Sequence, residues 1–231
     1  MIEKILPSQV AVAEAQTDPP EAALYPGEEE LIRNAVESRR KEFTTARWCA
    51  RRALSELGFA PAAILKGERG APIWPEGVVG SMTHCAGYRA AATALRADVV
   101  TVGIDAEPHA PLPEGVHETI ALATEAQRER ELRRAFPEIR WDRLLFSAKE
   151  SVYKAWFPLT HRWLGFEQAD IVLHTDGSFT AGLLISATER EPAEGALVEG
   201  ATATPTSFRG RWLVADGLLA TAIVVPRAVH G

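Results

Sequence analysis

The order of predicted helices and strands constrains the fold of this 231-residue chain more than any other feature. A helical apolar period predicts a long helix over residues 28–57, which ends at Gly58 and Pro61. Turn signals between short apolar segments then predict an antiparallel meander of strands at 78–83, 88–95 and 99–104. The order repeats, with helices at 117–134 and 140–157, then strands at 169–174, 179–185, 212–215 and 218–225 and a loop at 186–209. This succession predicts an α+β fold with two similar halves.

Composition and charge exclude several classes of protein. The net charge of −6 argues against a broad basic surface for nucleic acid. No apolar run approaches the roughly 18 residues that cross a bilayer, and the N-terminus lacks the apolar core of a signal peptide. Cys49 and Cys85 are too few for a disulfide framework or a closed zinc site. We therefore expect a cytoplasmic protein that binds neither membranes nor nucleic acid.

The stretch from Phe146 to Trp156 is predicted to be an amphipathic helix, since it contains neither proline nor glycine. Glu150 and Lys154 are four residues apart and therefore share one face of this helix. Taken alone, they are explained equally well by a surface ion pair, which contributes only about 0.3–0.5 kcal/mol. A second acidic pair upstream favours a functional role.

Asp105 and Glu107 follow the predicted strand 99–104. Alternate residues of a strand point the same way, so both carboxylates face one side, and Gly103 lets a ligand or another backbone come close. By themselves the two acids are more simply explained as a solvated strand end. Together with Glu150 they offer a shell of carboxylate oxygens, which suits Mg²⁺.

Several cations accompany these acids. Lys149 and Lys154 flank Glu150, and Arg39 lies on the apolar stripe of the first predicted helix, where a charge is unusual. Each cation alone is explained by solvation at the surface, and His84 alone by a structural role. The other basic residues of the set are Arg47, Lys66 and His84. Carboxylates that can bind a metal ion, surrounded by several cations, predict a site for a polyphosphate with Mg²⁺.

Three motifs follow one another along the chain: Gly80-Ser-Met-Thr83-His84-Cys85, Val102-Gly-Ile-Asp105-Ala-Glu107 and Phe146-Ser-Ala-Lys149-Glu150-Ser-Val-Tyr-Lys154. In this order they resemble the motifs of the 4′-phosphopantetheinyl transferases. The resemblance covers roughly residues 28–165. It is strongest to the surfactin-synthetase-activating type, and within that type to the branch of the enterobactin synthase component.

The resemblance implies transfer of the phosphopantetheine arm of coenzyme A to a serine of an acyl, peptidyl or aryl carrier protein, with release of 3′,5′-ADP. Coenzyme A is then a co-substrate, and Mg²⁺, or alternatively Mn²⁺, is the metal cofactor. Asp105, Glu107 and Glu150 match the metal-binding acids of the family. Lys154 matches the lysine beside the pyrophosphate, where it would stabilise or protonate the departing 3′,5′-ADP, and Lys149 is close to Lys154 on the same helix. Glu150 would take the serine proton, either directly or through a metal-bound water.

The same resemblance assigns a second group of residues to the phosphates of coenzyme A. His84 matches a histidine that contacts one phosphate, and Thr83 stands before it where a serine is common. Arg39, Arg47 and Lys66 match the basic groups around the 3′-phosphate and the adenine. The first helix offers three rivals for this role, namely Arg40, Arg51 and Arg52.

The family's fold implies two similar halves, each with a long helix on an antiparallel sheet and the active site between them. We expect an N-terminal half at 1–107 that binds coenzyme A, a C-terminal half at 108–231 that carries the catalytic helix, and a monomer. Two alternatives use the same residues: a Mg²⁺-dependent phosphodiesterase or pyrophosphatase acting on nucleotides, and a non-catalytic module that binds coenzyme A or a carrier protein. Transfer to a carrier serine distinguishes the transferase from both.

Overall fold

Two antiparallel sheets form the frame of the computed structural model, which describes residues 1–186 and 204–228. The smaller sheet has the order β1-β3-β2, with bounds Ala11–Ala15, Tyr88–Leu95 and Val78–Cys85. The larger sheet has the order β4-β8-β7-β6-β5, with bounds Val99–Pro108, Leu218–Pro226, Ser207–Ala215, Ser178–Leu183 and Ala169–Leu173. Together with the helices, these sheets confirm the predicted α+β fold.

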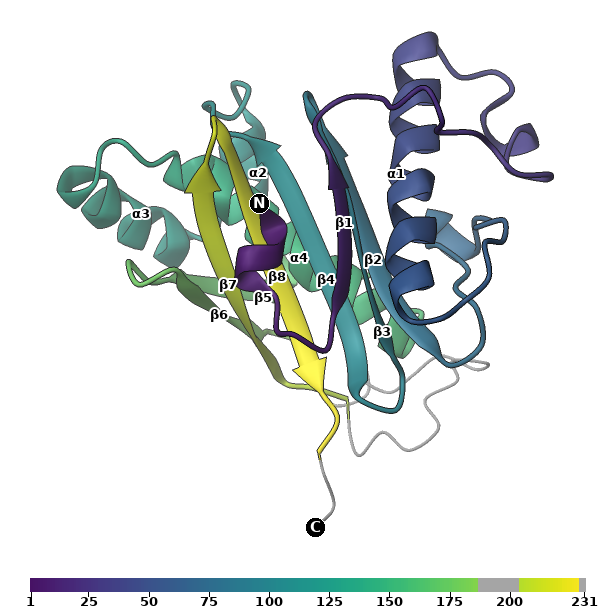
Figure 1. Cartoon of the computed structure of the whole chain (residues 1–231). Coiled ribbons are helices and arrows are strands. Elements are labelled where there is room, and N and C mark those ends of the chain that lie inside the picture. The colour runs from purple at the N-terminus through teal and green to yellow at the C-terminus, as the bar shows by residue number, and fades with distance from the viewer. Residues whose placement is uncertain (187–203, 229–231) are drawn as a thin grey trace.

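One long helix covers each sheet. α1, Glu37–Glu56, packs against β3 and β1, and α4, Trp141–Thr160, packs against β4 and β8. The short α2, Val116–Ile120, precedes α3, Ala123–Ala135. Figure 1 shows α1 on one side of the molecule and α3 on the other, with β4 and β8 between them. None of the helices in the described ranges is long and apolar enough to cross a membrane.

Strand β4 departs from the predicted meander. It pairs with β8, so that Gly103 lies opposite Ile223, and it forms no ladder with β3 in the described sheets. The reason is that both edges of β3 are already used, one by β1 and the other by β2. The prediction of a three-stranded meander was therefore wrong for its last strand.

The first helix begins at Glu37, later than the predicted residue 28. Residues 28–36 instead form turns and the short 3₁₀ helix Glu30–Ile32. The side chain of Glu28 is fully buried and accepts hydrogen bonds from Tyr25 and Arg51, which hold this segment against α1. The predicted loop at 186–209 is only partly described, since residues 187–203 lie outside the described ranges. Its last residues already belong to β7.

Hydroxyl side chains join the two sheets along the seam between β2 and β4. Ser81 Oγ accepts a hydrogen bond from the backbone N–H of Ile104 at 3.1 Å, and Thr83 Oγ1 accepts one from Ala106 at 3.0 Å. The two residues alternate along β2, so both hydroxyls point at β4. They satisfy backbone donors on the edge strand of the larger sheet. The seam places Asp105, at the end of β4, between the two sheets.

Because Gly103 has no side chain, α4 can pack close against β4. A β-carbon on Gly103 would come 2.1 Å from the backbone oxygen of Ser151 and 2.7 Å from the backbone nitrogen of Ala155. Thr101 Oγ1 donates a hydrogen bond to the carbonyl oxygen of Ala155 at 2.9 Å. The buried apolar face of α4 covers the core of the larger sheet, with Leu144, Ala148, Val152 and Trp156. This contact fixes the spacing between the strand and the helix that carry the predicted acids.

Candidate active site

Asp105 lies at the centre of the predicted site. Its side chain is 6% exposed, and its Oδ1 accepts hydrogen bonds from Lys154 Nζ at 2.8 Å and Thr83 Oγ1 at 3.3 Å. Its Oδ2 is buried and has no hydrogen-bond partner among the described residues. A buried carboxylate oxygen without a partner is costly, so this atom is suited to bind a ligand.

Helix α4 brings Glu150 and Lys154 to Asp105. Lys154 Nζ also donates to the carbonyl oxygen of Ile104 at 3.1 Å, which holds the ammonium group against β4. Burial raises the pKa of Glu150; Lys154 lowers it and the charge of Asp105 raises it. In the described part of the chain, no hydrogen bond or ion pair engages the Glu150 side chain. A carboxylate with a raised pKa and no partner is a competent proton acceptor.

Glu107 has a partner that the sequence did not indicate. Arg143 Nη1, near the start of α4, donates to Glu107 Oε2 at 2.8 Å. The same guanidinium group donates to the carbonyl oxygens of Ala110 and Pro111 at 3.2 and 2.7 Å. Burial and the charge of Asp105 raise the pKa of Glu107, whereas Arg143 lowers it. Arg143 thus ties this acid and the connector after β4 to the helix.

The charge of Asp105 raises the pKa of both Glu107 and Glu150, so the three predicted metal ligands interact electrostatically. Over residues 1–186 and 204–228, however, no group of three or more His, Cys, Asp or Glu side chains is arranged to hold an ion. Lys154 and Arg143 instead pair with two of the acids. The donor set still fits Mg²⁺, since it is all oxygen and includes the unpartnered Oδ2 of Asp105. The metal assignment stays a prediction.

Arg39 and His84 meet between α1 and β2. Arg39 Nη1 forms a hydrogen bond with His84 Nε2, and Glu42 lies 3.4 Å from both residues. Burial lowers the pKa of His84 to about 4, and the positive charge of Arg39 adds to this effect. The charge of Lys154 also lowers the pKa of His84, so His84 interacts electrostatically with the lysine that pairs with Asp105.

Two further cations of the predicted set gather around the ring of Phe43. Arg47 Cζ lies 3.3 Å and Lys66 Nζ 5.1 Å from the ring centroid. Burial lowers the pKa of Lys66, and the charges of Arg39 and Arg47 lower it further. Arg39, Arg47 and Lys66, together with the neutral His84 beside Arg39, are called the cation cluster below. Cations that repel one another in this way favour binding of an anion.

The three rival arginines of α1 have partners elsewhere. Arg51 forms a buried ion pair with Glu28 at 2.8 Å. Arg40 donates to a backbone carbonyl oxygen, and Arg52 lies over an indole ring. Arg47 is also buried and donates its Nε to a carbonyl oxygen at 2.8 Å, and burial lowers its pKa to about 10. Glu28 carried no motif in the sequence, so this buried acid was missed.

Lys149 lies away from the predicted substrate site. Its side chain is 1% exposed, and its Nζ lies 2.9 Å from Oε2 of Glu125. It also donates to the carbonyl oxygens of Phe166 and Ala169 at 2.7 and 2.8 Å. All three N–H groups of the ammonium therefore have partners inside the protein. This placement does not support the predicted contact of Lys149 with substrate, because the ammonium group forms an ion pair with Glu125 inside the protein. No signal in the sequence had marked Glu125.

Tyr153 lies one residue before Lys154 on α4. Its Oη is buried and has no hydrogen-bond partner in the described ranges. Its ring centroid lies 5.1 Å from that of Trp163. Burial raises the pKa of Tyr153, and the charge of Glu150, three residues earlier on α4, raises it further. The sequence contained Tyr153 within the helical motif but gave no reason to single it out.

Two family models match the chain in succession. The 4′-phosphopantetheinyl transferase N-terminal domain matches residues 27–94. The model of the 4′-phosphopantetheinyl transferase superfamily matches residues 101–204. Between them they contain β2 with His84, the acid pair of β4 and the whole of α4.

Individual relatives agree with the family models. The 4′-phosphopantetheinyl transferase Npt of Nocardia iowensis is 53% identical over 228 residues, which cover 96% of this chain and 99% of Npt. The 4′-phosphopantetheinyl transferase PptT of Mycobacterium tuberculosis is 48% identical over 233 residues, which cover 97% of this chain and 98% of PptT. Enterobactin synthase component D of Salmonella typhi is 31% identical over 124 residues, covering 54% of this chain and 51% of that protein, and supports the predicted branch. The chain belongs to the 4′-phosphopantetheinyl transferase superfamily.

Proposed function

We propose that the protein transfers the 4′-phosphopantetheine arm of coenzyme A to a serine hydroxyl of an acyl, peptidyl or aryl carrier protein. The serine oxygen bonds to the phosphorus of the arm, the bond between this phosphorus and the bridging oxygen breaks, and 3′,5′-ADP leaves. Besides family membership, one observation carries the proposal. The Lys154 ammonium lies 2.8 Å from Asp105 and one helical turn from Glu150, so that a cation for the leaving group and a base for the serine lie together.

Glu150 takes the proton of the carrier serine in this account. Its burial and raised pKa suit that role, and no protein partner competes for it in the described ranges. Lys154, anchored to β4, stabilises the negative charge that develops on the departing 3′,5′-ADP. The cation cluster holds the 3′-phosphate on the α1 side of the seam.

The metal cofactor of the proposal is Mg²⁺ or Mn²⁺, held by Asp105, Glu107 and Glu150. When bound, such an ion neutralises charge on the pyrophosphate of coenzyme A. The unpartnered Oδ2 of Asp105 supports this assignment. The hydrogen bond from Arg143 holds the Glu107 side chain in position near the end of β4.

The division into halves at 1–107 and 108–231 belongs to the same proposal. The acids at the end of β4 then lie at the boundary, between the cation cluster on one side and α4 on the other. We also propose that the enzyme acts as a cytoplasmic monomer. Both substrates reach one site formed by a single chain.

Release of 3′,5′-ADP from coenzyme A, followed by chromatography, tests the proposed reaction. We expect release only when an apo carrier protein is present, and none with a carrier whose acceptor serine is replaced by alanine. Release that does not depend on the carrier would instead identify the nucleotide phosphodiesterase. Coenzyme A that binds but stays intact would identify the binding module.

Arg39→Gln is expected to weaken recognition of the 3′-phosphate. Loss of one charge-assisted contact corresponds to about a tenfold lower preference for coenzyme A over dephospho-coenzyme A, which lacks this phosphate. Isothermal titration with both ligands measures the preference. Lys41→Gln is the matched control, because Lys41 lies on the same helix but pairs with the exposed Glu37. An unchanged preference in Arg39→Gln would remove Arg39 from the phosphate site.

A further inference from the structure

A buried ion pair outside the substrate site described above involves Lys149, the residue that precedes Glu150 on α4. Lys149 on α4 and Glu125 on α3 are each 1% exposed, and Nζ lies 2.9 Å from Oε2. Lys149 Nζ also donates to two carbonyl oxygens, those of Phe166 and Ala169. The ammonium group therefore has three acceptors from three segments of the chain and no N–H left for a phosphate.

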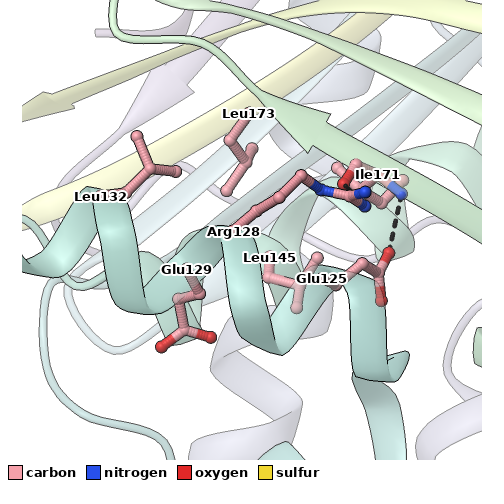
Figure 2. Close-up of a pocket in the computed structure, with 7 residues that line it drawn as sticks. All are labelled: Glu125, Arg128, Glu129, Leu132, Leu145, Ile171 and Leu173. Atoms are coloured by element: carbon pink, nitrogen blue, oxygen red, sulfur yellow. Dashed lines mark hydrogen bonds between the residues drawn. The ribbon is translucent and has the colours of Figure 1, made fainter.

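Glu125 is equally engaged. Its Oε1 accepts a hydrogen bond from the backbone N–H of Ile171 on β5, and its Oε2 accepts one from Leu122 at the start of α3, both at 2.7 Å. Figure 2 shows the Glu125 carboxylate pointing at Ile171, with Arg128 and Leu145 lining the same pocket. Together the two side chains join α3, β5, the short 3₁₀ turn Phe166–Gln168 and α4.

The geometry of this pair matters more than its energy. Desolvation offsets much of the attraction in a buried ion pair, so such a pair is weak evidence for stability alone. Its hydrogen bonds are directional, however, and they fix the rotation of α4 about its axis. Successive residues of a helix point about 100° apart, so fixing Lys149 also fixes the direction in which Glu150 leaves the helix.

We propose that Lys149 and Glu125 are a positioning pair, which holds the Glu150 carboxylate toward Asp105, and that Lys149 does not bind coenzyme A. This inference rests on the proposed function, in which Glu150 is the base. It replaces the role for Lys149 that the resemblance implied. Lys149 acts through Glu150, because its own ammonium group is already paired with Glu125 and two backbone carbonyl oxygens.

Steady-state kinetics of three variants test the pair, with an apo carrier protein and coenzyme A as substrates. Lys149→Met leaves Glu125 buried and unpaired, so kcat is expected to fall about 100-fold while KM for coenzyme A changes less than about threefold. Adding Glu125→Gln removes the uncompensated negative charge and keeps one acceptor oxygen, so that one of the two backbone N–H groups stays paired. The double variant is expected to regain about tenfold in kcat.

A third comparison asks whether the effect passes through Glu150. In a Glu150→Gln background, Lys149→Met is expected to lower kcat by less than about threefold, because the group that it positions is already gone. A full additional loss of about 100-fold would mean that Lys149 supports the fold in general, and it would overturn the proposal.

A direct contact of Lys149 with coenzyme A gives the opposite pattern. The dissociation constant of coenzyme A would rise about tenfold or more in Lys149→Met, and Glu125→Gln would rescue nothing. If Lys149→Met does not fold, the same comparison is made between Lys149→Met/Glu125→Gln and Glu125→Gln alone. Equal affinities support the positioning pair and a tenfold difference, about 1.4 kcal/mol, contradicts it. Transfer by the unaltered protein is measured alongside, so failure of the proposed function is seen separately.

Discussion

Glu150→Gln is expected to lower kcat for arm transfer by about 100- to 1,000-fold while coenzyme A still binds. Glutamine has nearly the same shape as glutamate but cannot take the serine proton, and it also loses a charge beside Asp105. The cation cluster proposed to hold the 3′-phosphate lies on the α1 and β2 side of the seam, so we expect binding of coenzyme A to depend little on Glu150. Single-turnover transfer to an apo carrier and titration of coenzyme A measure the two properties.

Glu131→Gln is the matched control for this substitution. Glu131 is an exposed residue of α3, so the same chemical change there is expected to leave kcat within about twofold of the unaltered protein. Retention of more than about a tenth of kcat by Glu150→Gln would show that the serine proton goes elsewhere. A loss of coenzyme A binding as large as the loss of kcat would place Glu150 in substrate binding instead.

Gly103→Ala is expected to destabilise the protein by about 3 kcal/mol and to damage catalysis as well. The added β-carbon would lie 2.1 Å from a backbone oxygen of α4, and backbone atoms cannot rotate away as a flexible side chain can. The helix must therefore move away from β4, which separates Glu150 and Lys154 from Asp105. A displacement of about 1 Å in such a site costs roughly 100-fold in rate. Chemical unfolding and kcat measure both effects.

Gly182→Ala provides the control for Gly103→Ala. Gly182 also lies in a strand, β6, but no atom stands within 4 Å of the β-carbon that alanine would add. We expect Gly182→Ala to change the free energy of unfolding by less than about 1 kcal/mol and to leave kcat unaltered. If Gly103→Ala behaved like Gly182→Ala, the close approach of α4 to β4 would not position the site.

Local patterns predicted the parts of the site that lie on single elements. The helical period and the spacing of Glu150 and Lys154 predicted α4 and the face that they share. The alternation of Asp105 and Glu107 at a strand end was also visible from local sequence. These features depend on residues a few positions apart, which is why sequence reasoning finds them.

Contacts between distant segments could not be predicted in the same way. β4 pairs with β8 from the far end of the chain, because β1 has taken the edge of β3 that the meander required. Lys149 and Lys154 look alike in sequence, yet only Lys149 meets a buried acid from another helix. Arg143 likewise shows its role only when α4 packs on β4 and reaches Glu107. Tertiary packing decides each of these cases.

The intact mass of an apo carrier protein, after incubation with this enzyme, coenzyme A and Mg²⁺, shows directly whether the arm is transferred. We expect a gain equal to one phosphopantetheine arm, which is lost on addition of EDTA and absent when the acceptor serine of the carrier is replaced by alanine. Acyl, peptidyl and aryl carrier proteins are each tested. No gain with any of them, whether coenzyme A is hydrolysed or merely bound, would contradict the transferase.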